Sequence, residues 1–207
     1  VKMRIYLLRH GHTIAGLHHN AALGVPDPPL DDTGIRQTES LGQRLQHYEI
    51  DAVYSSDLKR ATETAQIVCR YTHHDILYSP QLREINMGDI PIRGWEAFSD
   101  YYLEWQKHEA DRPYPQGEAG VDVQKRVWPL LEEIVKQHSR DTAVVTHGGV
   151  IMVILSACIG LGLEKRFRFT PPAYCSISTL SYNPYDSMWR VEQFNDTAHL
   201  GLVTVHP

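Results

Sequence analysis

The stretch Leu8-Arg9-His10-Gly11-His12-Thr13 directly follows the mostly apolar run Met3–Leu7, so two imidazoles and a guanidinium lie where a predicted strand gives way to a loop. The same arrangement recurs where the apolar run Thr142–Thr146 ends in His147-Gly148-Gly149. Ligands of open α/β sheets bind beyond the carboxyl ends of the strands. If these two strands lie parallel and adjacent, His10 and His147 meet at that edge. Imidazole is a nucleophile and a proton carrier near neutral pH, so this pair is the candidate reaction centre.

Length and composition predict one domain. With 207 residues and 42% hydrophobic content, the chain can bury a sizeable core, and we expect a single domain over residues 1–207. The 20 basic and 25 acidic residues give a net charge of −5, so no bulk positive field favours nucleic acid or an anionic membrane. The three cysteines are too scattered for a disulfide scaffold, and no apolar run reaches the length of a membrane helix. We therefore expect a cytoplasmic protein without a signal peptide that binds neither nucleic acid nor membrane.

Strand-like runs alternate with helical patterns, which favours a mostly parallel sheet with helices on both faces. The sequence predicts an α/β three-layer sandwich with a small helical insertion or lid, residues 85–120, after the fourth strand. Helices are expected from near Thr33, with Ile35, Leu41 and Leu45 on its apolar face, and over residues 58–71, 121–138 and 150–159. Ser55-Ser56-Asp57 is a natural cap for the second of these helices. Residues 177–182 and 189–194 are expected to pair as a hairpin.

Four aromatic side chains in the insertion follow a helical spacing. Trp95, Phe98, Tyr102 and Trp105 are separated by three, four and three residues, which places them on one face of a helix. Such a stripe usually packs in a core, and this is the favoured interpretation. The alternative is a lid over the reaction centre.

Four separate stretches occur in order along the chain: Leu8–Thr13, Ser55–Ala65, Leu82–Glu84 and Thr146–Gly149. Smaller matching stretches are Pro29–Gly34, Gly117-Glu118 and Arg126-Val127. Together they resemble the histidine phosphatase superfamily, whose members include the cofactor-dependent phosphoglycerate mutases. The resemblance extends over nearly the whole chain.

The resemblance implies a phosphoryl transfer in which His10 attacks phosphorus in line and becomes phosphohistidine, which water then hydrolyses. The loose, anionic transition state needs fixed positive charge, which the planar forks of Arg9 and Arg60 supply. His147 adds a third donor. The substrate-binding residues implied in this way are Arg9, Thr13, Arg60, His147 and Gly148. Neither a cofactor nor a metal ion is expected.

The leaving oxygen needs a proton. A carboxylic acid can give one when burial or nearby negative charge lifts its pKa toward neutrality. The resemblance places the general acid at Glu84, which lies two residues after the apolar Leu82 and directly before Ile85. The alternative is a surface ion pair between Glu84 and Arg83 or Arg93.

Several positions depart from the family pattern. His12 stands where many relatives have glutamate, Gly16 where they commonly have asparagine, and Ala119 where serine is frequent; Asn20 is a candidate replacement for the missing asparagine. Thr13 is either a phosphate donor or a helix cap. His199 could line the entrance, although a hydrogen-bonded structural role is favoured.

The 12 histidines invite a metalloenzyme hypothesis, but no His-Glu-x-x-His or paired Cys-x-x-Cys spacing accompanies them. We therefore predict a phosphomonoesterase that acts on a small phosphorylated metabolite. The alternatives are a cofactor-dependent phosphoglycerate mutase and a catalytically inactive protein that binds a phosphorylated ligand. The sequence is compatible with a homodimer and does not determine the oligomeric state.

Overall fold

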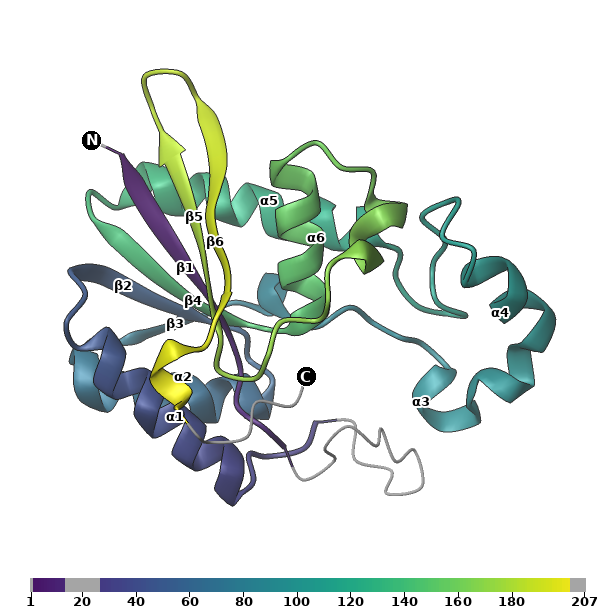
Figure 1. Ribbon diagram of the computed structural model, residues 1–207, viewed down its shortest axis with the longest axis horizontal. Helices are drawn as coiled ribbons and strands as arrows, with labels where there is room; N and C mark the ends of the chain where they lie inside the picture. The colour runs from purple at the N-terminus through teal and green to yellow at the C-terminus, as the bar shows by residue number, and fades with distance from the viewer. Residues whose placement is uncertain (1, 14–26, 202–207) are drawn as a thin grey trace.

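The computed structural model describes residues 2–13 and 27–201, which are arranged around a six-stranded sheet (Figure 1). The strands are β1 (Met3–Arg9), β2 (Ile50–Ser55), β3 (Ile76–Tyr78), β4 (Asp141–Thr146), β5 (Ile177–Asn183) and β6 (Met188–Asp196). Their order in the sheet is β3-β2-β4-β1-β5-β6. The first four strands in this order run parallel, whereas β5 and β6 are antiparallel to their neighbours and form the expected hairpin.

The central strands β1 and β4 determine where the two histidine stretches lie. They pair in parallel, with Leu8 opposite Val145 and Arg9 opposite Thr146. Both strands are almost continuously buried, as a central parallel pair covered on both faces must be. Their carboxyl ends therefore lie side by side at one edge of the sheet.

Helices cover both faces of the sheet (Figure 1). On one face pack α1 (Asp32–Leu45) and α2 (Lys59–Thr72), and on the other α5 (Gly120–Gln137) and α6 (Gly148–Cys158). Each face has its own cluster of buried apolar side chains, and adjacent residues of β1 contribute to opposite clusters because strand side chains alternate. Short 3₁₀ helices cover residues Pro80–Leu82, Leu163–Arg168 and Ala198–Leu200. The α/β three-layer sandwich is confirmed.

The insertion follows β3, the third strand along the chain, and not a fourth strand as predicted; in the described part of the chain only β1, β2 and β3 precede it. It contains α3 (Ile90–Arg93), a 3₁₀ helix (Trp95–Phe98) and α4 (Ser99–Trp105), and it projects to one side of the sheet (Figure 1). The Trp95 ring lies 4.7 Å from that of Tyr102 and 5.0 Å from that of Trp105. The aromatic stripe thus packs partly buried against the main core, as the favoured interpretation predicts, although it spans two short helices rather than one.

The start of α2 differs from the prediction. Its N-cap is Leu58, which has no side-chain capping bond. The carboxylate of Asp27 accepts the Lys59 N–H at 2.7 Å instead. Asp57, which the sequence predicts in the cap, forms a bidentate ion pair with Arg83. Arg83 Nε donates to Asp57 Oδ1 at 2.7 Å, and Arg83 Nη2 donates to Asp57 Oδ2 at 2.6 Å. Lys59 and Asp57 therefore have long-range partners, whereas Ser56 keeps a local hydrogen bond to the Leu58 N–H.

One residue of the predicted apolar face of α1 is misplaced. Leu41 and Leu45 are fully buried, but Ile35 is 42% exposed. With about 3.6 residues per turn, Ile35 lies roughly 120° around the helix from Leu41, outside the buried stripe.

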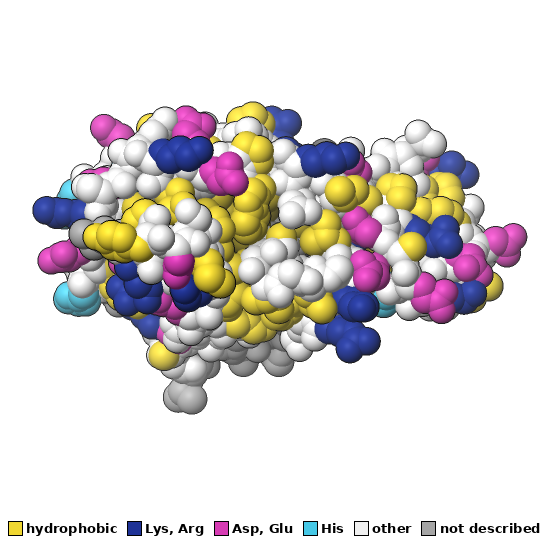
Figure 2. Space-filling view, turned by 90° about the horizontal axis from the view of Figure 1, so that it is seen from above, with side chains coloured by type: hydrophobic (Ala, Val, Ile, Leu, Met, Phe, Trp, Pro, Cys, Tyr) yellow, Lys and Arg dark blue, Asp and Glu magenta, His cyan; other side chains and the backbone are white. Residues whose placement is uncertain are grey.

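The face shown in Figure 2 has no single dominant charge. On this face, basic and acidic side chains are interspersed among apolar ones. Across residues 2–13 and 27–201, no helix has both the length and the apolar character that crossing a bilayer requires.

Candidate active site

His10 and His147 meet at the carboxyl ends of β1 and β4. Each directly follows its strand, and their ring centroids are 5.0 Å apart. The backbone N–H of His10 donates to the carbonyl of Thr146 at 3.0 Å, which ties the two strand ends together. Both histidines are buried. The expectation that parallel, adjacent strands bring this pair together is confirmed.

The hydrogen bonds of His10 assign its proton. Its Nδ1 lies 2.8 Å from the carbonyl oxygen of Gly11, which can only accept, so Nδ1 carries the hydrogen. Its Nε2 accepts a hydrogen bond from Arg60 Nε at 3.2 Å and so presents a lone pair. Burial first, and then the charges of Arg60 and Arg9, hold the pKa of His10 well below its usual 6.5. A neutral His10 with a lone pair on Nε2 can act as a nucleophile.

The side chain of His147 is held by Ser56. Its Nε2 lies 2.9 Å from Ser56 Oγ, which already accepts the Leu58 N–H at 3.3 Å and so has its own hydrogen free for the ring. His147 Nδ1 is buried and has no hydrogen-bond partner among residues 2–13 and 27–201. Burial first, and then the charge of Arg60, hold the pKa of His147 well below its usual value. His147 is thus neutral, and in the tautomer in which Ser56 donates to Nε2, its Nδ1 is a hydrogen-bond donor.

Two arginines converge on this pair. Arg9 ends β1, and Arg60 lies in the first turn of α2, as the sequence predicts. Arg60 Nη1 donates to Asp27 at 3.2 Å. Arg9 Nη1 donates to the carbonyl of Pro172, whereas Arg9 Nε is buried without a partner within the described structure. Burial lowers the pKa of both guanidinium groups, and the negative charge of Glu84 opposes this at each.

Glu84 lies against the start of α6. One carboxylate oxygen accepts the Ile85 N–H at 2.8 Å, and the other accepts the Gly149 N–H at 3.1 Å. A Cβ on Gly149 would lie 2.6 Å from Glu84 Oε1, so only glycine leaves room for the carboxylate. The motif that contains His147 therefore also positions Glu84.

The alternative of a surface ion pair for Glu84 is wrong. Arg83 pairs with Asp57, and Arg93 pairs with Asp89. No ion pair in the described residues includes Glu84. Both candidate arginines pair with other carboxylates.

Arg126 holds the backbone around Glu84. Its Nη1 donates to the carbonyl of Gln81 at 2.6 Å, and its Nη2 donates to that of Glu84 at 3.2 Å. Its Nε donates to Glu118 Oε1 at 2.9 Å, while Glu118 Oε2 accepts the Asn86 N–H at 2.8 Å. The pair of Arg126 and Glu118 thus closes the base of the insertion next to Glu84.

Two further predicted substrate-binding residues lie beside the site. Gly148 begins α6, where a Cβ would lie 3.4 Å from Arg9 Nε. Thr13 is 4% exposed and pairs with Leu30. It caps none of the described helices, because the N-cap of α1 is Asp31.

The positions that depart from the family pattern divide into three groups. His12 Nδ1 is bonded to the Asp31 carboxylate, which places it next to the site. Ala119 is buried as the N-cap residue of α5, and His199 Nε2 is 2.9 Å from the carbonyl of Cys175, a structural bond. Gly16 and Asn20 lie outside the described residues.

Sequence reasoning missed three residues of this site. The sequence indicates a helix cap at Ser56 and gives no signal at Asp27 or Tyr174. The Arg9 guanidinium carbon lies 3.8 Å from the Tyr174 ring centroid. Asp27 is followed by two prolines, and Tyr174 lies in a connecting segment, so neither belongs to a periodic pattern. Only tertiary contacts reveal them.

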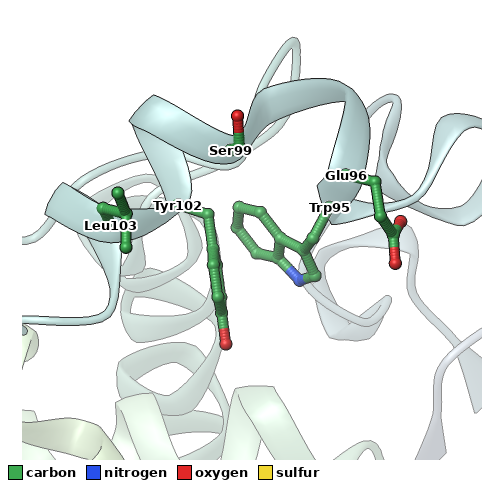
Figure 3. Close-up of a pocket in the computed structure, with 5 residues that line it drawn as sticks. All are labelled: Trp95, Glu96, Ser99, Tyr102 and Leu103. Carbon is green, nitrogen blue, oxygen red and sulfur yellow. The ribbon is translucent and has the colours of Figure 1, made fainter.

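An open cavity lies elsewhere, in the insertion. It is lined by Trp95, Glu96, Ser99, Tyr102 and Leu103. The rings of Trp95 and Tyr102 project to the same side of their helices (Figure 3). It shares no residue with the histidine site. Its lining contains no histidine or arginine, the residue types that make the histidine site a candidate for phosphoryl transfer.

The described residues contain no group of three or more His, Cys, Asp or Glu side chains placed to hold a metal ion. Positive charge at the site comes from Arg9 and Arg60.

Comparison with known proteins gives concordant matches. Residues 5–197 match the histidine phosphatase superfamily, branch 1. The probable phosphoglycerate mutase GpmB of Yersinia pestis is 31% identical over 213 residues, covering 97% of this chain and 96% of that protein. A mycobacterial glucosyl-3-phosphoglycerate phosphatase has a TM-score of 0.79 at 26% identity, covering 94% of this chain and 99% of the other. Bacillus stearothermophilus YhfR has a TM-score of 0.81 at 27% identity, covering 96% and 99%.

The resemblance seen in the sequence is confirmed by these matches, which cover nearly all of the chain. The phosphatase among its structural neighbours supports a phosphatase enzyme. The chain belongs to branch 1 of the histidine phosphatase superfamily.

Proposed function

We propose that this protein is a phosphomonoesterase that hydrolyses small phosphorylated metabolites through a phosphohistidine on His10. One observation carries the proposal. Two buried nitrogens of the histidine site, Arg9 Nε and His147 Nδ1, have no hydrogen-bond partner in the described residues. A buried unpaired donor costs about 1–3 kcal/mol, and a phosphoryl group offers the oxygens that would pair both.

In the first step, the lone pair of His10 Nε2 forms a bond to phosphorus while the bond from phosphorus to the ester oxygen breaks. Arg9, Arg60 and His147 Nδ1 stabilise the charge on the equatorial oxygens. Glu84 gives its proton to the leaving oxygen, so the alcohol departs neutral. The hydrogen bond from His10 Nδ1 to Gly11 stabilises the charge that develops on the ring.

In the second step, water attacks phosphohistidine and the bond from nitrogen to phosphorus breaks. Glu84, now a carboxylate, takes the proton of the water. Inorganic phosphate leaves, and His10 regains its lone pair. Protons and electron pairs balance over the two steps without a cofactor.

Activity should survive removal of metal ions. Because Arg9, Arg60 and His147 supply the positive field, we expect full activity after exhaustive dialysis against EDTA. Vanadate should inhibit strongly, since its five-coordinate adduct resembles the in-line transition state. Phosphate release is measured before and after dialysis, with the undialysed enzyme as control. A loss that only zinc, manganese or magnesium restores would overturn the metal-free mechanism.

The second candidate function is a phosphoglycerate mutase. It is favoured by the 31% identity to proteins named probable phosphoglycerate mutase. Both activities use His10 and differ in whether water or a second hydroxyl group takes the phosphoryl group. A third candidate, an inactive protein that binds a phosphorylated ligand, keeps the same contacts but turns over no substrate.

Parallel assays on one preparation separate these functions. We expect phosphate release from several monoesters, independent of added 2,3-bisphosphoglycerate, and little conversion of 3-phosphoglycerate to 2-phosphoglycerate. Isomerisation that outruns release by about tenfold, or about 1.4 kcal/mol in barrier, would establish the mutase instead. Binding without either reaction would establish the inactive protein.

A further inference from the structure

Tyr174 lies beneath the Arg9 guanidinium, inside the site but without a role in the proposed reaction. The guanidinium carbon is 3.8 Å from the ring centroid, and Tyr174 is only 5% exposed. The ring also contacts both histidines of the first motif, with centroids 5.6 Å from His10 and 5.0 Å from His12. An aromatic face attracts a cation placed over it, and more strongly when water is excluded.

The guanidinium of Arg9 occupies a slot beside Tyr174 and Gly148. On one side is the Tyr174 ring, and near it a Cβ on Gly148 would lie 3.4 Å from Arg9 Nε and 3.6 Å from its Cζ. Within the slot, Nη1 donates to the carbonyl of Pro172, and Nε has no partner within the described structure. The ring therefore limits the orientations in which the unpaired Nε–H can meet a ligand.

The segment that carries Tyr174 is fixed independently of any ligand. The backbone N–H of Cys175 donates to the carbonyls of Arg9 at 3.1 Å and His10 at 3.3 Å. His199 Nε2 lies 2.9 Å from the Cys175 carbonyl on the other side of the segment. The ring is thus held against the site by the backbone of the same two residues whose side chains it contacts.

We propose that Tyr174 is a positioning residue that holds the Arg9 guanidinium in the orientation that binds the phosphoryl group. The inference rests on the proposed function and extends it to a residue that does not touch the reacting atoms. The ring acts through its face, so its hydroxyl group is dispensable. Loss of the ring leaves Arg9 charged but free to tilt within its slot, which weakens binding of every phosphate ester alike.

The test compares Tyr174→Phe, which keeps the ring, with Tyr174→Leu, which removes it. For Tyr174→Leu we expect KM for p-nitrophenyl phosphate and the vanadate inhibition constant to rise about 5- to 30-fold, with kcat changed much less. Tyr174→Phe should stay close to the wild type in all three. Tyr48→Leu is the matched control, because Tyr48 lies 5.9 Å beneath Arg44 outside the site. It should leave KM and the inhibition constant unchanged.

Three outcomes overturn the proposal: unchanged constants in Tyr174→Leu, an equal loss in Tyr174→Phe, or a fall in kcat alone. If the leucine variant does not fold, Tyr174→Met gives the same comparison with a flexible side chain in place of the ring. Calorimetric binding of vanadate to the same variants separates this inference from the proposed function. A wild type that binds vanadate but releases no phosphate would refute the hydrolase and leave the Tyr174 comparison intact, whereas a wild type that binds none would refute both.

Discussion

Glu84→Gln should slow the hydrolysis of alkyl phosphates by roughly 10²–10⁴-fold, the usual contribution of general acid catalysis. Glutamine keeps an oxygen that can accept the Gly149 N–H, so the site should stay assembled, but it has no acidic proton for the leaving oxygen. p-Nitrophenyl phosphate should be affected much less, because its phenolate leaves without a proton. The measurement is kcat/KM for an alkyl and an aryl ester on wild type and variant.

Arg60→Ala is the control for this prediction. Arg60 contacts His10 Nε2 and would stabilise the charge on the phosphoryl oxygens, which both esters share. Its loss should therefore reduce activity on the two esters alike. If Glu84→Gln shows equal losses for both esters, Glu84 is a binding or structural residue and the proton comes from elsewhere.

The central part of the fold could be predicted because its signals are local and repeated. The buried runs before His10 and His147 identify β1 and β4, and parallel pairing then places the two rings 5.0 Å apart. The alternation of strands and helices likewise predicts the layers. These features depend on periodicity, which a single sequence displays directly.

The remainder of the site could not be predicted because it depends on competition between partners. Ser56 and Asp57 are good local capping residues, yet Ser56 contacts His147 and Asp57 pairs with Arg83. Local propensity is a weak preference, and tertiary contacts of a buried imidazole override it. Tyr174 has no local signal at all, since its position beneath Arg9 follows from the pairing of distant backbone segments.

His10→Ala should abolish turnover by removing the nucleophile. No other group in the described site combines the same features: a buried ring, a proton fixed on Nδ1 by Gly11 and a lone pair on Nε2 next to Arg60. His147 is the nearest alternative, but its Nε2 is already hydrogen-bonded with Ser56. Alanine also removes the acceptor for Arg60 Nε without filling the space that the ring occupies.

The most direct test of phosphohistidine catalysis is to trap the intermediate. The wild-type enzyme is incubated briefly with a radiolabelled phosphate ester and quenched in alkali, and the protein-bound label is then measured. Wild type should retain label that is stable to base and lost in acid, as a phosphorus–nitrogen bond requires, and His10→Ala should retain none. Label that persists in His10→Ala, or a wild type that hydrolyses the ester without ever carrying label, would contradict the account.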